Sequence, residues 1–366
     1  MRSHIRTTFA NNVFSLLIRT LGSEPLRKPP ASLSGKAKWQ RHSTYSLLKK
    51  MKNVFYSQNL KKSYLLELTL KRISIEEYPY RKKRSMEIEG KVVVVTGAGA
   101  GIGAALAEVA ASRKARKVIV ADKNGQNATK VAEKVNGISY EVDVSNENQI
   151  QKMVAAIEHD HGPIDLFCSN AGFVTSAGLE DTNERIQKMW EVHVMAHIYA
   201  ARAVLPQMIA NGGGYLLNTA SAAGMLTQIG SLSYSITKSA AVSLAEWISI
   251  THFHQGIRVS VLCPQAVRTD ILVNSPDNKE DDDPEWEEGG VASSDGIIEP
   301  NDVAEVCMEA IREERFMILP HDQVQGYTEF KARNPEKWLS GMRKFQDRLF
   351  FDEPLPGDLM QNFRQS

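Results

Sequence analysis

Runs of apolar, β-branched residues alternate with segments of helical periodicity along the chain from Lys91 onward. Unbroken runs of Val and Ile are typical of strands buried on both faces, and helices between successive strands make neighbouring strands parallel. Because such crossovers are right-handed, we expect an α/β fold with one doubly wound parallel sheet, whose ligands lie at the carboxyl ends of the strands. The predicted strands are 91–96, 117–122, 138–144 and 164–172, and the helices between them are 101–113, 124–135 and 147–162.

The later part of the chain continues this pattern and adds a tail. Long helices are predicted at 183–210 and 232–254, followed by a helix at 299–314 and a last strand at 315–320. We therefore expect a single α/β domain at 88–322, preceded by an extension at 1–87 and followed by a helical tail at 323–366. The apolar side chains of the amphipathic tail are expected to pack on the core or, as the alternative, to cover a site or a partner: Tyr327, Phe330, Trp338, Met342, Phe345 and Leu349.

Charge separates the extension from the rest of the chain. The whole chain has a formal net charge of +1 and 42% hydrophobic residues, as an ordinary globular protein does. However, residues 1–89 contain 19 Lys and Arg against 6 Asp and Glu, and the remainder contains 25 against 37. Three cysteines lie far apart in or beside apolar runs, so we expect buried free thiols and a reducing compartment: Cys168, Cys263 and Cys307.

The basic extension has several interpretations. Residues 1–23 contain arginines, several Ser and Thr and no acid, with apolar residues near one helical face, which is typical of a mitochondrial transit peptide. A disordered basic segment is one alternative, and translation beginning at Met86 is another. The cluster 81–84 has no aromatic residues between its charges, so a solvated linker is favoured over contact with nucleic acid. The longest early apolar run, 13–18, is too short to span a bilayer, and the expected compartment is the cytoplasm or the mitochondrial matrix.

A glycine-rich turn, TGAGAGIG at 96–103, follows the first predicted strand and begins the first helix. Gly97 permits a tight turn, while Gly101 and Gly103 allow backbone and helix to approach a pyrophosphate closely. The amide groups and the positive dipole end of the helix then point at that anion. The turn therefore predicts a dinucleotide cofactor.

The residue at the end of the second predicted strand, Asp122, indicates which dinucleotide is preferred. A carboxylate there accepts hydrogen bonds from the ribose hydroxyls and repels a 2′-phosphate. We therefore expect NAD, with NADP less favoured, although the basic Lys123 is adjacent. The alternative role of Asp122 is that of a helix N-cap.

Three polar residues further along have a defined spacing. Ser221 lies where a strand passes into a loop, Tyr234 comes thirteen residues later, and Lys238 four residues after that. Tyr and Lys at i and i+4 share one face of the predicted helix. With the T-G-x-x-x-G-x-G turn, this Ser and the Y-x-x-x-K pattern resemble the short-chain dehydrogenase/reductase family over about residues 88–320. The resemblance implies a Rossmann-like fold and NAD-dependent transfer of hydride between nicotinamide and a secondary alcohol or ketone.

The resemblance also implies a role for each residue. Tyr234 would be the general base in alcohol oxidation and the acid in reduction, Ser221 would hold the substrate oxygen, and Lys238 would bind the nicotinamide ribose. Because a neighbouring ammonium and an oxidised nicotinamide both favour the phenolate, we expect Lys238 and the bound cofactor to bring the pKa of Tyr234 down from its ordinary value near 10. The residues expected to bind the cofactor are Thr96, Gly97, Gly99, Gly101, Ile102, Gly103, Asp122, Asp143, Val144, Asn170, Ala171, Gly172, Tyr234, Lys238, Val267 and Thr269.

Three positions depart from the family's pattern. His193 stands where the family has an Asn that helps to hold a proton-relay water beneath the catalytic Lys, so His193 is a further candidate catalytic residue. Packing on a helix face is its alternative role. Ser169 replaces a usual Asn, and Gln265 stands where the family generally has Gly. His193 and His197 are four residues apart, but no Cys or carboxylate converges on them in the sequence, so no metal is expected.

The substrate and the assembly are less constrained by the sequence. Seven acids between Glu280 and Glu288 would disfavour an anionic substrate if they faced the cleft, although a solvated loop is favoured. We expect an uncharged small-molecule alcohol or ketone. The resemblance implies a homodimer or homotetramer formed through the helices 183–210 and 232–254. A non-catalytic dinucleotide-binding scaffold or redox sensor is the alternative function.

Overall fold

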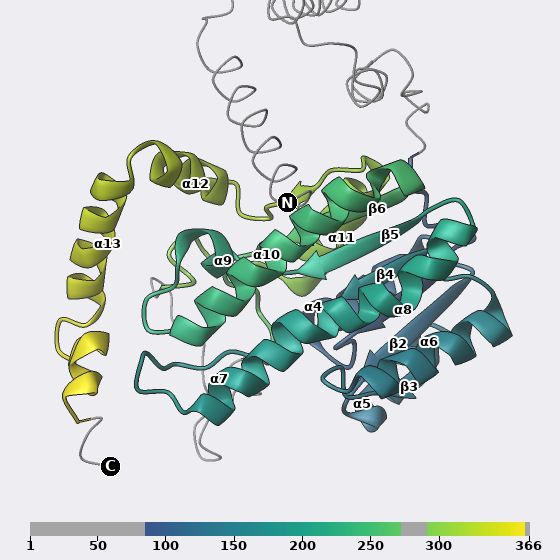
Figure 1. Cartoon of the computed structure of the whole chain (residues 1–366), viewed down its shortest axis with the longest axis horizontal. Coiled ribbons are helices and arrows are strands. Elements are labelled where there is room, and N and C mark those ends of the chain that lie inside the picture. Colours follow the sequence, from purple (N-terminus) through teal and green to yellow (C-terminus); the bar gives the residue numbers. More distant parts are fainter. Residues whose placement is uncertain (1–84, 272–290, 363–366) are drawn as a thin grey trace, which may run out of the picture. The chain divides into compact units, whose positions relative to one another are not determined.

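The computed structural model describes residues 85–271 and 291–362. The predictions for the basic extension, residues 1–84, and for the acidic segment 272–290 lie outside these residues. Within the described part, seven parallel strands form one sheet in the order β3-β2-β1-β4-β5-β6-β7 (Figure 1). The doubly wound parallel α/β fold predicted from the sequence is thus confirmed.

Strands and helices alternate along the chain, as the hydrophobic pattern predicts. The first half contains β1 (Val92–Thr96), α4 (Gly101–Ser112), β2 (Lys117–Asp122), α5 (Gly125–Lys134), β3 (Ile138–Glu141), α6 (Glu147–His161) and β4 (Leu166–Ser169). The second half contains α7 (Asn183–Trp190), α8 (Ala196–Ala210), β5 (Gly214–Thr219), α9 (Ala223–Leu226), α10 (Leu232–His252), β6 (Ile257–Leu262), α11 (Pro300–Arg312), β7 (Met317–Ile318), α12 (Gln323–Arg333) and α13 (Pro335–Leu349).

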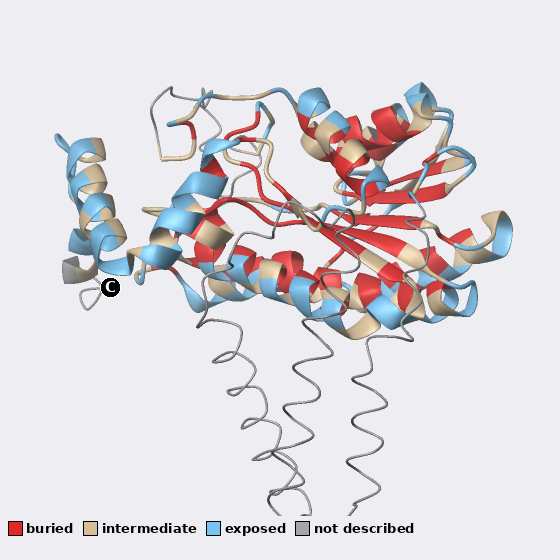
Figure 2. Cartoon of the chain, turned by 90° about the horizontal axis from the view of Figure 1, so that it is seen from above, coloured by how far each residue is buried: buried red, intermediate tan, exposed pale blue. Residues whose placement is uncertain are grey.

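Two hydrophobic layers bury the two faces of the sheet, and β1 contributes to both. Val92 and Val94 pack with apolar residues of α6, α8 and α10, whereas Val93 and Val95 pack with those of α4, α5 and α11. This alternation follows from the two-residue period of a strand. Figure 2 shows the buried residues concentrated in the sheet and on the helix faces that cover it. All three cysteines are free and buried in these layers, as predicted: Cys168, Cys263 and Cys307.

The strand order reverses beside β1, because the chain passes from β1 to β2 and β3 on one side and to β4 on the other. At such a switch point the loops after neighbouring strands diverge, which opens a crevice at the carboxyl ends of the strands. The glycine turn after β1 and the segment after β4 are therefore brought together at this edge.

One of the predicted helices is interrupted. The helix expected at 183–210 contains a π-helical turn, Glu191–Met195, between α7 and α8. Such turns occur frequently at functional sites. The helical tail contains two helices, because α12 ends at Arg333 and Pro335 begins α13. Proline fits the first turn of a helix but not the interior, which explains the break.

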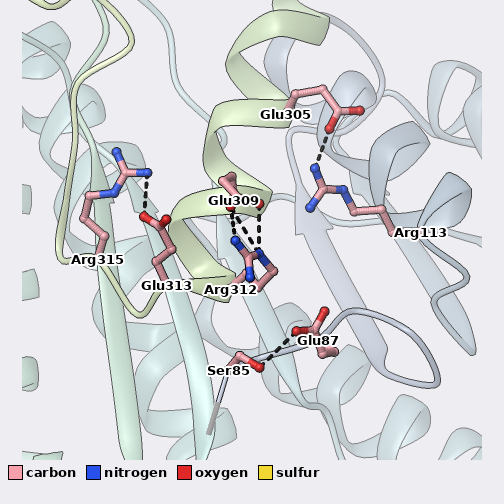
Figure 3. A network of polar contacts seen from close by, with 8 residues as sticks. All are labelled: Ser85, Glu87, Arg113, Glu305, Glu309, Arg312, Glu313 and Arg315. Atoms are coloured by element: carbon pink, nitrogen blue, oxygen red, sulfur yellow. Dashed lines mark hydrogen bonds and ion pairs between the residues drawn. The ribbon is translucent and has the colours of Figure 1, made fainter. Parts of the chain in front are cut away.

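Ion pairs link the outer helices on one side of the sheet. Figure 3 shows Arg113 at the end of α4 bonded to Glu305 of α11, with the two charged atoms 2.5 Å apart. Arg312 and Glu309 pair one turn apart on α11, and Arg315 pairs with Glu313 at 3.1 Å. Partly exposed pairs of this kind stabilise a fold by about 0–1 kcal/mol each, so the buried apolar layers dominate stability.

None of the helices in the described ranges has both the length and the apolar character needed to cross a membrane.

Candidate active site

The glycine turn packs tightly against the loop after β4. Gly97 and Gly101 adopt left-handed backbone conformations, with φ angles of +62° and +53°. A Cβ atom added to Gly97 would lie 2.6 Å from the Cα atom of Ala171, so a side chain does not fit there. No side chain caps the N-terminus of α4 at Ala100. Its first amide groups are therefore available to an anion, as a pyrophosphate site requires.

The carboxylate of Asp122 lies directly beside this turn. One oxygen accepts a hydrogen bond from the Gly99 amide, and the other from the Asn124 amide, both at 2.9 Å. The N-cap of α5 is Asn124, whose side chain accepts from the Asn127 amide at 3.0 Å. The alternative role of Asp122 as a helix N-cap is therefore wrong: its carboxylate holds the glycine turn and lines the crevice.

Asn170 joins three strand ends beneath the crevice. Its amide nitrogen donates to the carbonyl oxygens of Thr96 and Gly97, at 3.2 and 3.3 Å. Its side-chain oxygen accepts from the hydroxyl of Thr219 at 3.1 Å. The Asn170 backbone amide also donates to the Thr96 hydroxyl at 3.0 Å. Asn170 and Thr96 therefore fix the relative positions of β1, β4 and β5.

Ser221, Tyr234 and Lys238 come together although they belong to two different segments. Ser221 follows β5, and its hydroxyl accepts from the Ala223 amide at 3.1 Å and donates to the Pro264 carbonyl at 3.4 Å. Tyr234 and Lys238 lie on successive turns of α10, and the Lys238 ammonium is 5.6 Å from the centre of the Tyr234 ring. The same ammonium donates to the Thr219 carbonyl at 3.0 Å. All three side chains are buried to more than nine-tenths.

One cavity of about 650 Å³ is lined both by residues around the glycine turn and by residues around Ser221. Its wall includes the glycine turn, Asp122 and the three polar side chains Ser221, Tyr234 and Lys238. Of the predicted cofactor and catalytic positions, Thr96, Gly103 and His193 are outside its lining. Those that line it are Gly97, Gly99, Gly101, Ile102, Asp122, Asp143, Val144, Asn170, Ala171, Gly172, Ser221, Tyr234, Lys238, Val267 and Thr269.

A family model described as short chain dehydrogenase matches residues 91–280, which is more than half of the chain. The chain belongs to this family.

Curated relatives of this short-chain dehydrogenase include the human estradiol 17-beta-dehydrogenase 11. That protein is 28% identical over 272 residues, which are 72% of this chain and 85% of the relative. An uncharacterized oxidoreductase of Staphylococcus aureus is 29% identical over 227 residues, 60% of this chain and 90% of the relative.

Solved structures show the same fold. A short chain dehydrogenase/reductase from Burkholderia phymatum in complex with NAD has a TM-score of 0.62 and 29% identity, and the match covers 69% of this chain and 96% of that one. A 3-ketoacyl-(acyl-carrier-protein) reductase from Brucella melitensis, with a TM-score of 0.57 and 24% identity over 63% of this chain and 97% of that one, supports the fold alone. The chain is accordingly an NAD(P)-binding oxidoreductase of the type that acts on the CH–OH group of donors.

Burial shifts the pKa values of Tyr234 and Lys238 in opposite directions. Burial raises the pKa of Tyr234 above its ordinary value, and a hydrogen bond to Ser221 lowers it only in part. Burial also lowers the pKa of Lys238 to about 8. These directions are those of the protein alone, and the lowering of the Tyr234 pKa by Lys238 together with oxidised nicotinamide stays a prediction. Both groups are held toward their neutral forms, because the cavity wall removes them from water.

His193 links the loop after β4 to the catalytic helix. It lies fully buried in the π-helical turn, where one ring nitrogen accepts from the Phe173 amide at 3.2 Å and the other is 3.0 Å from the Thr237 hydroxyl. The ring of Tyr234 is edge-on to it at 5.6 Å. Burial and the nearby Lys238 lower the pKa of His193 well below 6.5, so its imidazole is neutral. Its two ring nitrogens and its edge contact with Tyr234 connect His193 to both segments, and its part in proton transfer stays a prediction.

Gln265 lies in the segment after β6 and contacts a residue far along the chain. The Gln265 amide donates to a ring nitrogen of His321 at 3.2 Å, a contact that ties this segment to the beginning of the tail. Val267 forms a parallel bridge to Ile298, which holds Val267 and Thr269 at the cavity. Glycine is therefore not required at position 265, since the His321 side chain completes the turn.

Sequence reasoning missed several residues of the site. Thr219 holds Lys238, and Thr237 and Phe173 hold His193. These contacts join residues far apart in the chain, so no local motif signals them. The tail contributes four more lining residues, which belong to the set that the sequence offered for covering a site as the alternative to core packing: Tyr327, Trp338, Met342 and Phe345. In the described part of the chain, His, Cys, Asp and Glu form no group of three that could hold a metal ion.

Proposed function

We propose that this chain is an NAD-dependent dehydrogenase that interconverts an uncharged secondary alcohol and the corresponding ketone. The observation that carries the proposal is the convergence of Ser221, Tyr234 and Lys238 on the cavity that also contains Asp122 and the glycine turn. The residues present fit a dinucleotide: Gly97 leaves room for close approach, and the uncapped N-terminus of α4 faces the same cavity. Bound nicotinamide would accept hydride in oxidation and supply it in reduction.

The residues of the chain provide the binding of the oxygen and the movement of the proton. The Ser221 hydroxyl lies beside Tyr234 and would donate a hydrogen bond to the substrate oxygen. Tyr234 would take the hydroxyl proton in oxidation and return it in reduction. Its raised pKa keeps the hydroxyl protonated in the free protein, which suits reduction directly. Oxidation needs the phenolate, which Lys238 favours whenever its own ammonium is charged.

The test is a turnover assay on the full chain with a panel of secondary alcohols and ketones, read by the absorbance of NADH. We expect NAD-dependent oxidation of at least one uncharged alcohol and the reverse reaction with its ketone. NADH binding without turnover across the panel would support the alternative, a dinucleotide-binding scaffold or redox sensor.

Asp122→Asn should shift the cofactor preference toward NADP. Removing the charge removes the repulsion of a 2′-phosphate, while the amide oxygen can still accept from Gly99. We expect the ratio of the NADPH to the NADH dissociation constant to fall at least about tenfold. Fluorescence titration with each reduced cofactor measures this ratio. Asp160→Asn, on the exposed end of α6, is the control. An unchanged ratio would mean that Asp122 only supports the glycine turn.

We also propose that the protein forms a homo-oligomer through α10, as the family resemblance implies. Three large apolar side chains lie exposed along this helix: Ile236 at 52%, Trp247 at 59% and Ile250 at 80%. Such a row is typical of a subunit interface. Light scattering after gel filtration should give a dimer or tetramer for the wild type and a monomer for Trp247→Glu combined with Ile250→Glu. Phe351→Glu, at another exposed apolar residue, should leave the mass unchanged. A monomeric wild type would refute the proposal.

A further inference from the structure

We infer that the tail forms a binding wall for a bulky apolar group of the substrate, an inference that rests on the proposed function. Four of its side chains line the cavity that contains Ser221 and Tyr234: Tyr327, Trp338, Met342 and Phe345. They come from α12 and α13, which lie outside residues 91–280, the part matched by the family model. The wall therefore lies outside the part of the chain that the family model matches.

The first tail helix is anchored to the body of the domain. Val324 is fully buried and packs with Ala222 and Leu226, which are next to Ser221 in the chain. The Lys331 ammonium donates to the Met225 carbonyl at 2.6 Å. Tyr327 donates to Asp295 at 2.9 Å. These contacts hold α12 against the loop that carries the catalytic serine, so α12 fixes where α13 begins.

The second tail helix lies against the cavity without being buried. Trp338, Met342, Phe345 and Leu349 are spaced four, three and four residues apart, so they share one face, and each is half-buried. In the described part of the chain, α13 contains no fully buried residue. Figures 1 and 2 show α13 extending away from the sheet as an outlying helix. The cavity lies between this face and the residues around Ser221, so a ligand in the cavity would cover the apolar side chains.

The chemistry of this wall specifies the ligand. The tail side chains in the cavity lining are aromatic or thioether groups, whereas the charged residues of α13 are exposed. Aromatic rings supply large rigid apolar surfaces, and Met adapts to irregular shapes. The polar end of the cavity, at Ser221 and Tyr234, takes the reacting oxygen. The substrate is therefore an alcohol or ketone whose remaining part is large, apolar and uncharged, either a fused ring system or a long chain.

The test compares alcohols of different size in the full-length protein. We expect the wild type to oxidise 2-undecanol or estradiol with a kcat/KM at least about tenfold above that for 2-butanol. Trp338→Ala and Met342→Ala should each raise KM for the large alcohol by about tenfold, and leave kcat/KM for 2-butanol and the NADH dissociation constant unchanged. A higher kcat/KM for estradiol than for 2-undecanol would indicate that the substrate contains a fused ring system. A higher kcat/KM for 2-undecanol would indicate a long chain. Leu339→Ala, on the exposed side of the same helix, is the matched control.

The outcomes separate this inference from the proposed function. Turnover of 2-butanol and the large alcohols with equal kcat/KM would overturn the binding wall and leave the dehydrogenase intact. An equal loss of kcat/KM for small and large alcohols in Trp338→Ala would also overturn the binding wall, because α13 would then act through the fold or the cofactor. No turnover of any alcohol by the wild type would instead refute the proposed function. Thermal unfolding of each variant checks that the half-buried substitutions leave the fold intact.

Discussion

Tyr234→Phe should lower kcat by a factor of about 10³ while NADH binds as tightly as in the wild type. Phenylalanine fills the same buried volume beside His193 and Ser221, so packing is retained and only the hydroxyl is lost. Without that hydroxyl, no group in the cavity wall accepts the alcohol proton at the position next to Ser221. The measurement is the initial rate of alcohol oxidation, together with a fluorescence titration of NADH.

The control for this prediction is Tyr199→Phe, which removes a hydroxyl from α8 outside the residues that line the cavity. It should retain wild-type kcat. A Tyr234→Phe variant that kept most of its turnover would refute the assignment of Tyr234 as the acid and base. Loss of NADH binding in the same variant would show that the residue acts on the cofactor rather than on the proton.

Lys238→Met should abolish most turnover and yet stabilise the folded protein at pH 7. Burial lowers the pKa of Lys238 from 10.5 to about 8, so keeping this ammonium charged inside the fold has a cost at neutral pH. A shift of this size lowers the free energy of unfolding of the wild type by about 3 kcal/mol, which the variant regains. The variant also loses the hydrogen bond from Lys238 to the Thr219 carbonyl, which lowers its free energy of unfolding by about 1 kcal/mol. We expect a net gain of about 2 kcal/mol in the free energy of unfolding. The rate should fall by a factor of about 10² or more, because the charge that favours the phenolate is lost.

The pH dependence of stability gives this prediction its second measurement. Between pH 8 and 10.5 the unfolded chain keeps the Lys238 proton while the folded protein has released it. The unfolded state therefore binds more protons, and wild-type stability rises with pH in this window. The advantage of Lys238→Met should shrink accordingly from pH 7 to pH 10. Denaturant unfolding at both pH values measures the difference in free energy of unfolding between this variant and the wild type. Lys130→Met, on the exposed face of α5, is the control. A variant less stable than the wild type at pH 7 would contradict the argument.

The sequence predicted the sheet and the position of its ligand crevice well. Runs such as Val92–Val95 are recognisable because a strand buried on both faces needs apolar side chains in both directions. The glycine turn is also a local signal, since Gly97 has a positive φ that other residues adopt at a cost. The Tyr and Lys pair follows from the helix period alone. Features that depend on short-range backbone geometry can thus be predicted from the sequence.

Two features of the site are not visible in local patterns. Burial raises the pKa of Tyr234 in the protein alone, and a Y-x-x-x-K motif does not show how far its tyrosine is buried. The helix 183–210 was expected to be regular, but the π-helical turn places His193 against Phe173 and Thr237. Both results depend on what the rest of the chain places around a residue.

By itself, the amino-acid sequence determined the parallel α/β fold, the dinucleotide turn and the set of polar residues that form the site. These follow from hydrophobic periodicity and from residue types whose backbone or chemical requirements are local. Tertiary structure alone decided that Asp122 holds Gly99, that His193 is buried between two segments, and that α13 lines the cavity instead of packing on the core. Each of these depends on contacts between residues far apart in the chain and on the removal of water from around them, which no local pattern records.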